Sequence, residues 1–239
     1  MSTGPSALGL ADVLRSTLIE ACRELTRSGL TYGTSGNISA RRDASSFFVS
    51  PTGTPYDTLS IADIPLVQFD GRWFGRLRPS SEWRMHRDIL AARPEVGAVV
   101  HTHSRHATAL ACTGRGIPAF HYMVAVAGGI DIRCAPYRIF GSQELSEVAL
   151  QALDGRRACL LGNHGVLAVG ADVAAALQLA GEVESLAAQY CDVLALGEPC
   201  MLTAAQMLEV VEKFRTYGRQ DAPDPGLRPA GAEIDQRSR

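Results

Sequence analysis

Ala98-Val99-Val100-His101-Thr102-His103 is the most informative segment of this 239-residue chain. The apolar run that begins at Val96 and leads into two histidines is typical of a buried β-strand. Side chains two positions apart in a strand project from the same face, with Cα atoms about 6.5–7 Å apart. We therefore expect the rings of His101 and His103 to converge on one metal ion, although the pair alone is equally compatible with core histidines.

A third histidine lies between two further predicted strands. Apolar segments at 158–161 and 166–169 predict the strands, and Gly162-Asn163-His164-Gly165 predicts a hairpin-like turn between them. Its glycines let the backbone aim the His164 side chain, which the flanking strands then fix. Taken alone, a turn histidine is more often simply solvated. Further short strands are predicted at 47–50 and 66–69.

Helical spacing of apolar residues alternates with these strands. An opening helix is predicted at 7–27, and the start signal Pro79-Ser80-Ser81-Glu82 opens another that runs to about Arg93. We expect one domain over residues 1–218 and a disordered tail over 219–239, which has almost nothing to bury. The remaining helices are predicted at 104–112, 120–127, 142–153, 171–196 and 204–217.

The composition favours a small-molecule partner. The 23 basic and 25 acidic residues are interspersed, so the formal charge of -2 gives no basic face for nucleic acid or a membrane. Six cysteines without a CxxC pair are typical of a reduced protein. The first ten residues lack the basic and apolar regions of a leader, and we expect a cytoplasmic protein.

Lysine usage bears on the mechanism. Among the 23 basic residues only Lys213 is a lysine, and it lies near the end of the last predicted helix. Because a Schiff-base enzyme needs a lysine in its pocket, this chain has a single candidate for covalent carbonyl chemistry.

Glu82 is the candidate for a fourth metal ligand. Three imidazoles and one carboxylate suit Zn²⁺ better than Mg²⁺. We expect Glu82 in the first turn of its helix, where the partial positive charge of unpaired amides favours the carboxylate and allows it to accept a proton. His86, four residues later, could orient this carboxylate or lie on the helix surface. His106 and His121 are interpreted as structural.

Small polar residues provide candidate phosphate contacts. Ser80 and Ser81 lie at the predicted helix start, where hydroxyl and amide groups can bind an anion. Thr34-Ser35-Gly36-Asn37 and Thr52-Gly53 offer further donors in glycine-containing loops. Each of these features alone is also compatible with an ordinary helix cap or turn.

An ordered series of motifs resembles the class II aldolase/adducin family over about residues 10 to 218. Within that family the resemblance is to aldolases that act on ketose 1-phosphates such as L-fuculose 1-phosphate. It implies an α/β fold, with a mostly antiparallel sheet between two helical layers, and a homotetramer with active sites between subunits. The motifs are Gly-Thr-Ser-Gly-Asn (33–37), Ser-Pro-Thr-Gly (50–53), Pro-Ser-Ser-Glu-Trp-Arg (79–84), Val-Val-His-Thr-His (99–103), His-Tyr-Met (121–123), Cys-Ala-Pro-Tyr (134–137) and Asn-His-Gly (163–165).

The resemblance also implies roles for individual residues. One Zn²⁺ per subunit would be bound by Glu82, His101, His103 and His164, and Glu82 would also be catalytic. Tyr122 and Tyr217 would act on the aldehyde half of a neighbouring subunit's substrate, and Phe140 would line the pocket. The phosphate would lie among Thr34, Asn37, Thr52, Gly53, Ser80 and Ser81.

The implied reaction is reversible cleavage of a ketose 1-phosphate to dihydroxyacetone phosphate and a short aldehyde. Ser35, Thr102 and Asn163 depart from the family pattern, but none of them removes a ligand. A sugar-phosphate 4-epimerase of the same family is a competing interpretation, disfavoured because Glu82 stands where that enzyme has Asp. The motifs are also compatible with a methylthioribulose-phosphate dehydratase and with a non-catalytic adducin-like interaction module.

Overall fold

The strand that carries His101 lies in the middle of an eight-stranded sheet. The computed structural model describes residues 7–217, and the tail expected at 219–239 lies outside them. The strand order is β4-β3-β2-β1-β5-β8-β7-β6, and every neighbouring pair is antiparallel except β6 and β7. The mostly antiparallel sheet is therefore confirmed. The strands are β1 (Asn37–Arg41), β2 (Ser46–Val49), β3 (Leu66–Gln68), β4 (Trp73–Phe74), β5 (Ala98–Thr102), β6 (Cys134–Ala135), β7 (Ala158–Leu161) and β8 (Gly165–Gly170).

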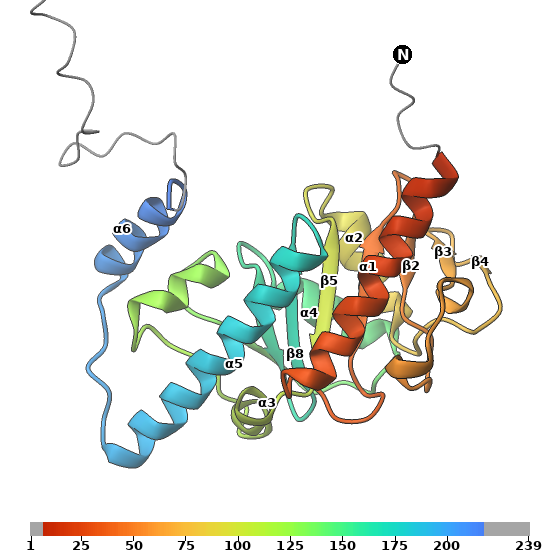
Figure 1. The fold of residues 1–239 in the computed structure, drawn as a ribbon. Helices are drawn as coiled ribbons and strands as arrows, with labels where there is room; N and C mark the ends of the chain where they lie inside the picture. The colour runs from red at the N-terminus through yellow and green to blue at the C-terminus, as the bar shows by residue number, and fades with distance from the viewer. Residues whose placement is uncertain (1–6, 218–239) are drawn as a thin grey trace, which may run out of the picture.

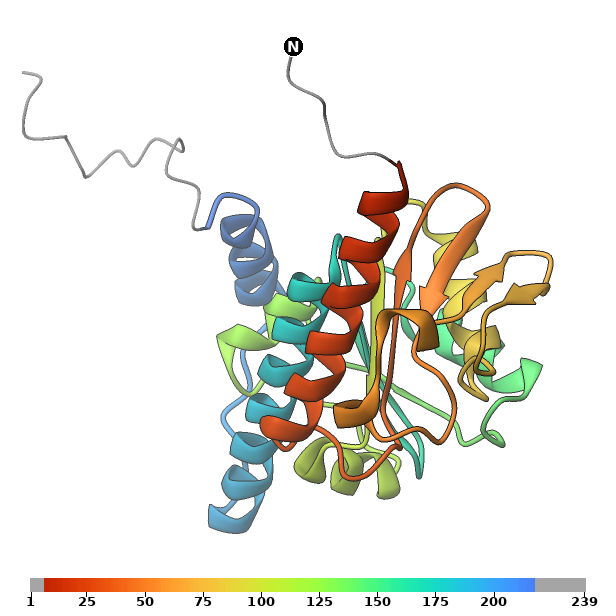
Figure 2. The same cartoon turned by 45° about the vertical axis from the view of Figure 1, so that its right-hand side comes forward.

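Helices cover both faces of the sheet. One face packs against α1 (Ala7–Arg27), α3 (Arg105–Cys112) and α5 (Val173–Leu196), and the other against α2 (Trp83–Ala92) and α4 (Gln143–Ala152). Figure 1 shows α1 and α5 in front of the strands with α2 and α4 behind, and Figure 2 shows α1 and α5 side by side. The three-layer α/β/α prediction is confirmed.

Two cores result from the alternation of side chains along the central strands. In β5, Ala98 and Val100 enter the core beneath α1 and α5, whereas Val99 enters the core beneath α2 and α4. The period of two that separates these cores also turns His101 towards the α2 side. Both faces of β5 are completely buried, as the apolar run predicts.

Several boundaries differ from the sequence prediction. Glu82 precedes α2 rather than occupying its first turn, because the helical conformation begins at Trp83. The segment predicted as an α-helix at 120–127 forms the 3₁₀ helix η3 (Tyr122–Ala127), in which backbone bonds join residues three apart. Two more 3₁₀ turns are η1 (Tyr56–Thr58) and η2 (Ile61–Asp63). The last helix, α6 (Ala204–Phe214), packs beside η3.

Three strands were not predicted, for physical reasons. β1 alternates, with Asn37 and Ser39 on the α2 side and Ile38 and Ala40 in the core beneath α1 and α5, but two apolar residues are too few to mark a strand clearly. β4 and β6 contain two residues each, which is too short for periodicity to be recognised.

The cysteines of the described chain are unpaired, and Cys22 lies deep in the core. All six cysteines are free thiols. Burial raises the pKa of Cys22 to about 12, so this thiol stays protonated in the core. None of the described helices combines the length and apolarity that are needed to cross a bilayer.

Candidate active site

Strand register brings the ends of three strands together at the site. His101 lies opposite Asn37 of β1 and opposite Leu167 of β8. The β7–β8 turn that carries His164 approaches closely, because a Cβ on Gly165 would lie 2.2 Å from the carbonyl oxygen of Thr102. Any larger residue there would push the turn away from His101 and His103, so Gly165 is required for the three histidines to meet.

The rings of His101, His103 and His164 surround one point. Their centroids are 4.8 to 5.0 Å apart and their planes meet at 75 to 78°. One potential ligand atom from each ring lies within 4.8 Å of the others. Glu82 approaches from a further side, with Oε2 at 3.2 Å from His101 Nε2 and Oε1 at 3.3 Å from His164 Nε2. The four predicted metal ligands are therefore brought together.

Hydrogen bonding around the cluster fits a metal ion. The carbonyl oxygen of Val166 accepts from His101 Nδ1 at 2.9 Å, which fixes the tautomer and leaves the lone pair of a neutral His101 on Nε2. This Nε2 lies 3.0 Å from His103 Nε2, so a proton or a cation must lie between the two nitrogens. The buried Oε1 of Glu82 makes no hydrogen bond within residues 7–217. A cation ligated by these atoms would satisfy all of them.

The electrostatics keep His103, His164 and Glu82 in the states that a metal requires. Burial, together with neighbouring histidines, lowers the pKa of His103 and of His164 to about 4, so both rings are neutral at pH 7. Burial opposes ionisation of Glu82, but His101, His164 and Asn37 outweigh it and hold the pKa of this carboxyl well below its usual range. Burial also opposes protonation of His101, but Glu82 outweighs it and raises the pKa of that ring.

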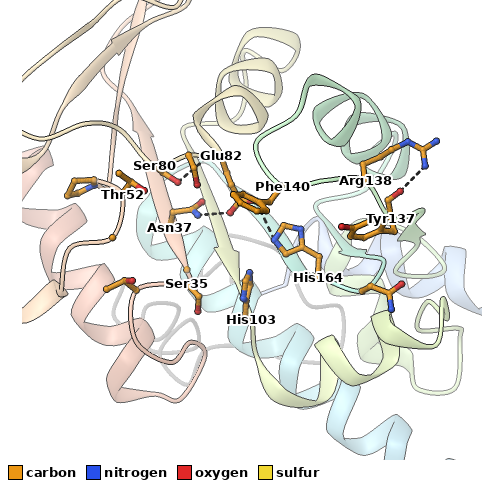
Figure 3. A pocket seen from close by; sticks show the side chains of 16 residues that line it. Ser35, Asn37, Thr52, Ser80, Glu82, His103, Tyr137, Arg138, Phe140 and His164 are labelled. Carbon is orange, nitrogen blue, oxygen red and sulfur yellow. Dashed lines mark hydrogen bonds and ion pairs between the residues drawn. The ribbon is translucent and has the colours of Figure 1, made fainter.

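The cluster opens into a pocket of about 320 Å³. In Figure 3, Glu82, His103 and His164 point towards one another, with Thr52 and Ser80 on one side and Tyr137 and Arg138 on the other. Every predicted phosphate contact lines this pocket, as does Phe140, while His101 is fully buried beneath it. The lining residues are Thr34, Ser35, Gly36, Asn37, Pro51, Thr52, Gly53, Ser80, Ser81, Glu82, His103, Tyr137, Arg138, Phe140, Asn163 and His164.

Comparison with known proteins places this geometry in a family. Residues 16–191 match the family model described as class II aldolase and adducin N-terminal domain. The chain belongs to the class II aldolase and adducin family. It is 53% identical over 205 residues to a 5-methylthioribulose-1-phosphate/5-deoxyribulose-1-phosphate aldolase of Rhodospirillum rubrum, covering 86% of this chain and 92% of that protein.

Two further relatives support the same membership. An L-fuculose phosphate aldolase of Escherichia coli is 45% identical over 206 residues, which cover 86% of this chain and 95% of the relative. A solved structure of L-fuculose 1-phosphate aldolase superimposes with a TM-score of 0.82 at 38% identity, covering 85% of this chain and 96% of that one. Class II aldolases are metal-dependent, and the three-histidine group is suited to holding the metal.

Two residues that the family resemblance assigned to the site lie away from the pocket of their own chain. Tyr122 on η3 and Tyr217 after α6 are 50% and 79% exposed, and neither lines the cavity. Their elements pack against each other at one end of the molecule, where Figure 1 shows α6 away from the sheet. Within one aldolase chain, the metal cluster and the tyrosines are separate groups.

The structure adds residues that the sequence did not single out. Tyr137 and Arg138 line the aldolase pocket, and Arg138 is the only arginine or lysine among the lining residues. The motif Cys-Ala-Pro-Tyr ends at Tyr137, so it was a signal for this loop, but nothing in the sequence indicates which side of the loop faces the cavity.

The remaining histidines have defined structural surroundings. His86 is 0% exposed, so its interpretation as a surface histidine is wrong. His106 Nδ1 lies 2.8 Å from Glu184, and His121 Nδ1 accepts from the amide of Met123 at the start of η3. A structural role for His106 and His121 agrees with these contacts.

Proposed function

We propose that this chain is a zinc-dependent aldolase that cleaves a ketose 1-phosphate reversibly to dihydroxyacetone phosphate and a short aldehyde. The observation that carries the proposal is the convergence of His101, His103, His164 and Glu82 at the floor of a hydroxyl-lined pocket. The names of the relatives, which are aldolases of sugar 1-phosphates, support the same reaction class.

The phosphate would bind on the Thr52 and Ser80 side of the pocket. Ser80 Oγ accepts a hydrogen bond from the amide of Glu82, which leaves the hydroxyl hydrogen of Ser80 free to donate. Gly53 has a positive φ of 61° and no atom near its Cβ position, so its backbone is open to a ligand. Hydroxyls and backbone amides would thus hold the phosphate without a lysine.

Glu82 would move the proton at C3 of dihydroxyacetone phosphate. Its contacts with His101 and His164 aim both oxygens at the cluster, where they can reach a substrate bound there. A bound Zn²⁺ would supply Lewis-acid stabilisation of the negative charge that develops when the C3–C4 bond breaks. No covalent intermediate with the protein is needed, in keeping with the exposed position of Lys213 at the end of α6.

Tyr122 of a neighbouring subunit would exchange the proton on the C4 oxygen, with Tyr217 beside the aldehyde half. Both side chains are exposed and outside the pocket of their own chain, as residues that serve another subunit must be. We therefore propose a homotetramer with active sites at its interfaces.

The pocket also offers aromatic surface to the aldehyde half of the substrate. Phe140 and Tyr137, which are 61% and 53% exposed, offer ring surfaces to the aldehyde half. Such a surface favours a short aldehyde with an apolar end, as a 5-deoxypentulose 1-phosphate, a methylthio analogue or L-fuculose 1-phosphate would release.

A panel of 1-phosphoketoses, assayed for release of dihydroxyacetone phosphate with and without added Zn²⁺, tests the proposal. We expect cleavage of at least one 5-deoxypentulose or 6-deoxyhexulose 1-phosphate, with loss of activity in the metal-free protein. Epimerisation at C4 without release of dihydroxyacetone phosphate would replace the aldolase proposal with a 4-epimerase. Dehydration of methylthioribulose 1-phosphate would replace it with a dehydratase.

A further inference from the structure

A chain of buried hydrogen bonds runs from β1 through α2 to the carboxylate of Glu82. Ser39 Oγ lies 2.7 Å from His86 Nδ1, and His86 Nε2 lies 2.5 Å from Asn37 Oδ1. The amide nitrogen of Asn37 donates to Glu82 Oε2 at 2.9 Å. Ser39 and His86 are 0% exposed, and Asn37 and Glu82 are 4% and 5% exposed, so water does not compete for these bonds.

Two elements place the four residues in line. Asn37 and Ser39 are two residues apart on β1, so both project from the face that α2 covers. Glu82 immediately precedes α2 and His86 lies in its first turn, and their contacts with Asn37 show that both side chains face β1.

The donors and acceptors can be assigned along the whole chain. A carboxylate only accepts, so Asn37 must present its amide nitrogen to Glu82 and its carbonyl oxygen to His86. His86 must then carry its hydrogen on Nε2, and its unprotonated Nδ1 must accept from the hydroxyl of Ser39. Burial lowers the pKa of His86 to about 3, so the ring carries a single hydrogen at neutral pH. All the bonds therefore donate in one direction, towards the carboxylate.

We propose that His86 is a positioning residue that acts through Asn37 to hold Oε2 of Glu82. By fixing the orientation of the Asn37 amide, it would leave Oε1 as the oxygen that faces His164 and is free to bind metal or accept a proton. This inference rests on the proposed roles of Glu82. The Asn37 amide has a second hydrogen, and Asn37 lines the pocket, so the same side chain can also face the phosphate.

Two substitutions of His86 separate this role from simple packing. In His86→Gln the amide nitrogen can take the place of Nε2 and still donate to Asn37, whereas in His86→Asn it reaches only the place of Nδ1 beside Ser39. We expect His86→Asn to lower both kcat and Zn²⁺ affinity by about 10- to 100-fold, as loss of a ligand-orienting partner does. His86→Gln should recover most of both losses.

Positioning and stability affect different measurable quantities. Zn²⁺ affinity is measured by competition with a chromophoric chelator, and the proton step by solvent deuterium incorporation at C3 of dihydroxyacetone phosphate. We expect His86→Asn to change kcat more than KM, because Ser80 and Thr52 still bind the phosphate. Ser146→Ala is the stability control, since it removes a buried hydroxyl of α4 that donates to Asp88 at 2.7 Å, away from the pocket.

Several outcomes would overturn the inference. Equal losses of Zn²⁺ affinity and kcat in His86→Gln and His86→Asn would show that His86 only packs. The same conclusion would follow if these losses were no larger than those of Ser146→Ala at the same drop in Tm. If His86→Asn fails to fold, Ser39→Ala replaces it. An unchanged Zn²⁺ affinity and an unchanged rate of deuterium incorporation in Ser39→Ala would count against the proposed positioning role of the hydrogen-bond chain. Glu82→Gln keeps the two proposals apart: retention of metal affinity and exchange in that variant refutes the role of Glu82 itself.

Discussion

The metal cluster and the tyrosine pair differ in how completely one chain builds them. Glu82 is 5% and His101 0% exposed, and each has named partners on neighbouring elements. Tyr122 and Tyr217 are 50% and 79% exposed and lie on η3 and after α6. The cluster is held by the sheet of a single subunit, whereas the tyrosines project from one end of the molecule.

This difference indicates which functions depend on assembly. The proposed metal site draws only on the end of β5, the β7–β8 turn and the residue before α2, so we expect a single chain to bind the metal. The proposed proton donor, Tyr122, lies outside that pocket, so we expect proton transfer to the aldehyde oxygen to require the assembled protein.

His103→Ala should abolish Zn²⁺ binding and lower activity at least about 1,000-fold, because several kcal/mol of charge stabilisation is lost with the metal. Metal content and kcat are measured on the same preparation. His106→Ala is the matched control, because this ring contacts Glu184 outside the cluster and its loss should leave the zinc content at one per subunit. Full metal occupancy in His103→Ala would remove His103 from the ligand set.

Chelation should have an effect of similar size in the unaltered protein. We expect EDTA to inactivate the enzyme and added Zn²⁺ to restore it, because the charge stabilisation comes from the metal. Borohydride with dihydroxyacetone phosphate should leave the mass unchanged, since Lys213, the only lysine, is exposed in the last turn of α6. A reduced adduct on Lys213 with full activity in EDTA would make this a Schiff-base aldolase.

Tyr122→Phe should lower kcat by about 10²- to 10⁴-fold while zinc stays bound, because a proton donor is lost and no ligand is. Mixed with inactive His101→Ala subunits and allowed to reassemble, it should recover activity, since some sites then combine an intact cluster with an intact tyrosine. Each variant reassembled alone is the control. Mixed assemblies that contain both subunits yet stay inactive would argue that the tyrosine does not serve a neighbour's site.

The smallest predicted effect is on how the free energy of unfolding depends on pH. The pKa of His86 is about 3 in the folded chain because the ring is buried, against about 6.5 when unfolded. The unfolded chain therefore binds the proton first as pH falls, so the stability that neutral His86 contributes is complete above pH 6.5 and is lost progressively towards pH 3.

Denaturant unfolding at pH 7 and pH 5 measures this loss. Between these two pH values the free energy of unfolding should fall by about 2 kcal/mol more in the unaltered chain than in His86→Gln. Tyr122→Phe should show the same pH dependence as the unaltered chain, because that residue is half exposed on η3. If the free energy of unfolding changed equally with pH in His86→Gln and in the unaltered chain, a neutral, buried His86 would be contradicted.

Much of the architecture was predictable because it depends on local patterns. The apolar run into His101, the helical periodicity of α1 and α5, and the glycines around His164 each follow from a few neighbouring residues. β1 was missed because only Ile38 and Ala40 mark it as apolar, and its other face is formed by Asn37 and Ser39, whose partners lie more than 40 residues away in the chain. Nothing local indicates that these two polar side chains are buried.

By itself, the sequence determined the candidate ligands and their approximate elements, because the identity of a donor atom and the period of a strand are local properties. It also determined, through the ordered motifs, the family to which the chain belongs. The contact of His86 with Glu82 through Asn37, and the side of the loop at Tyr137 and Arg138 that faces the cavity, became visible only in the folded chain. The reason is physical: hydrogen-bond partners and exposure depend on how distant segments pack, and spacing along the chain does not encode which segments will face each other.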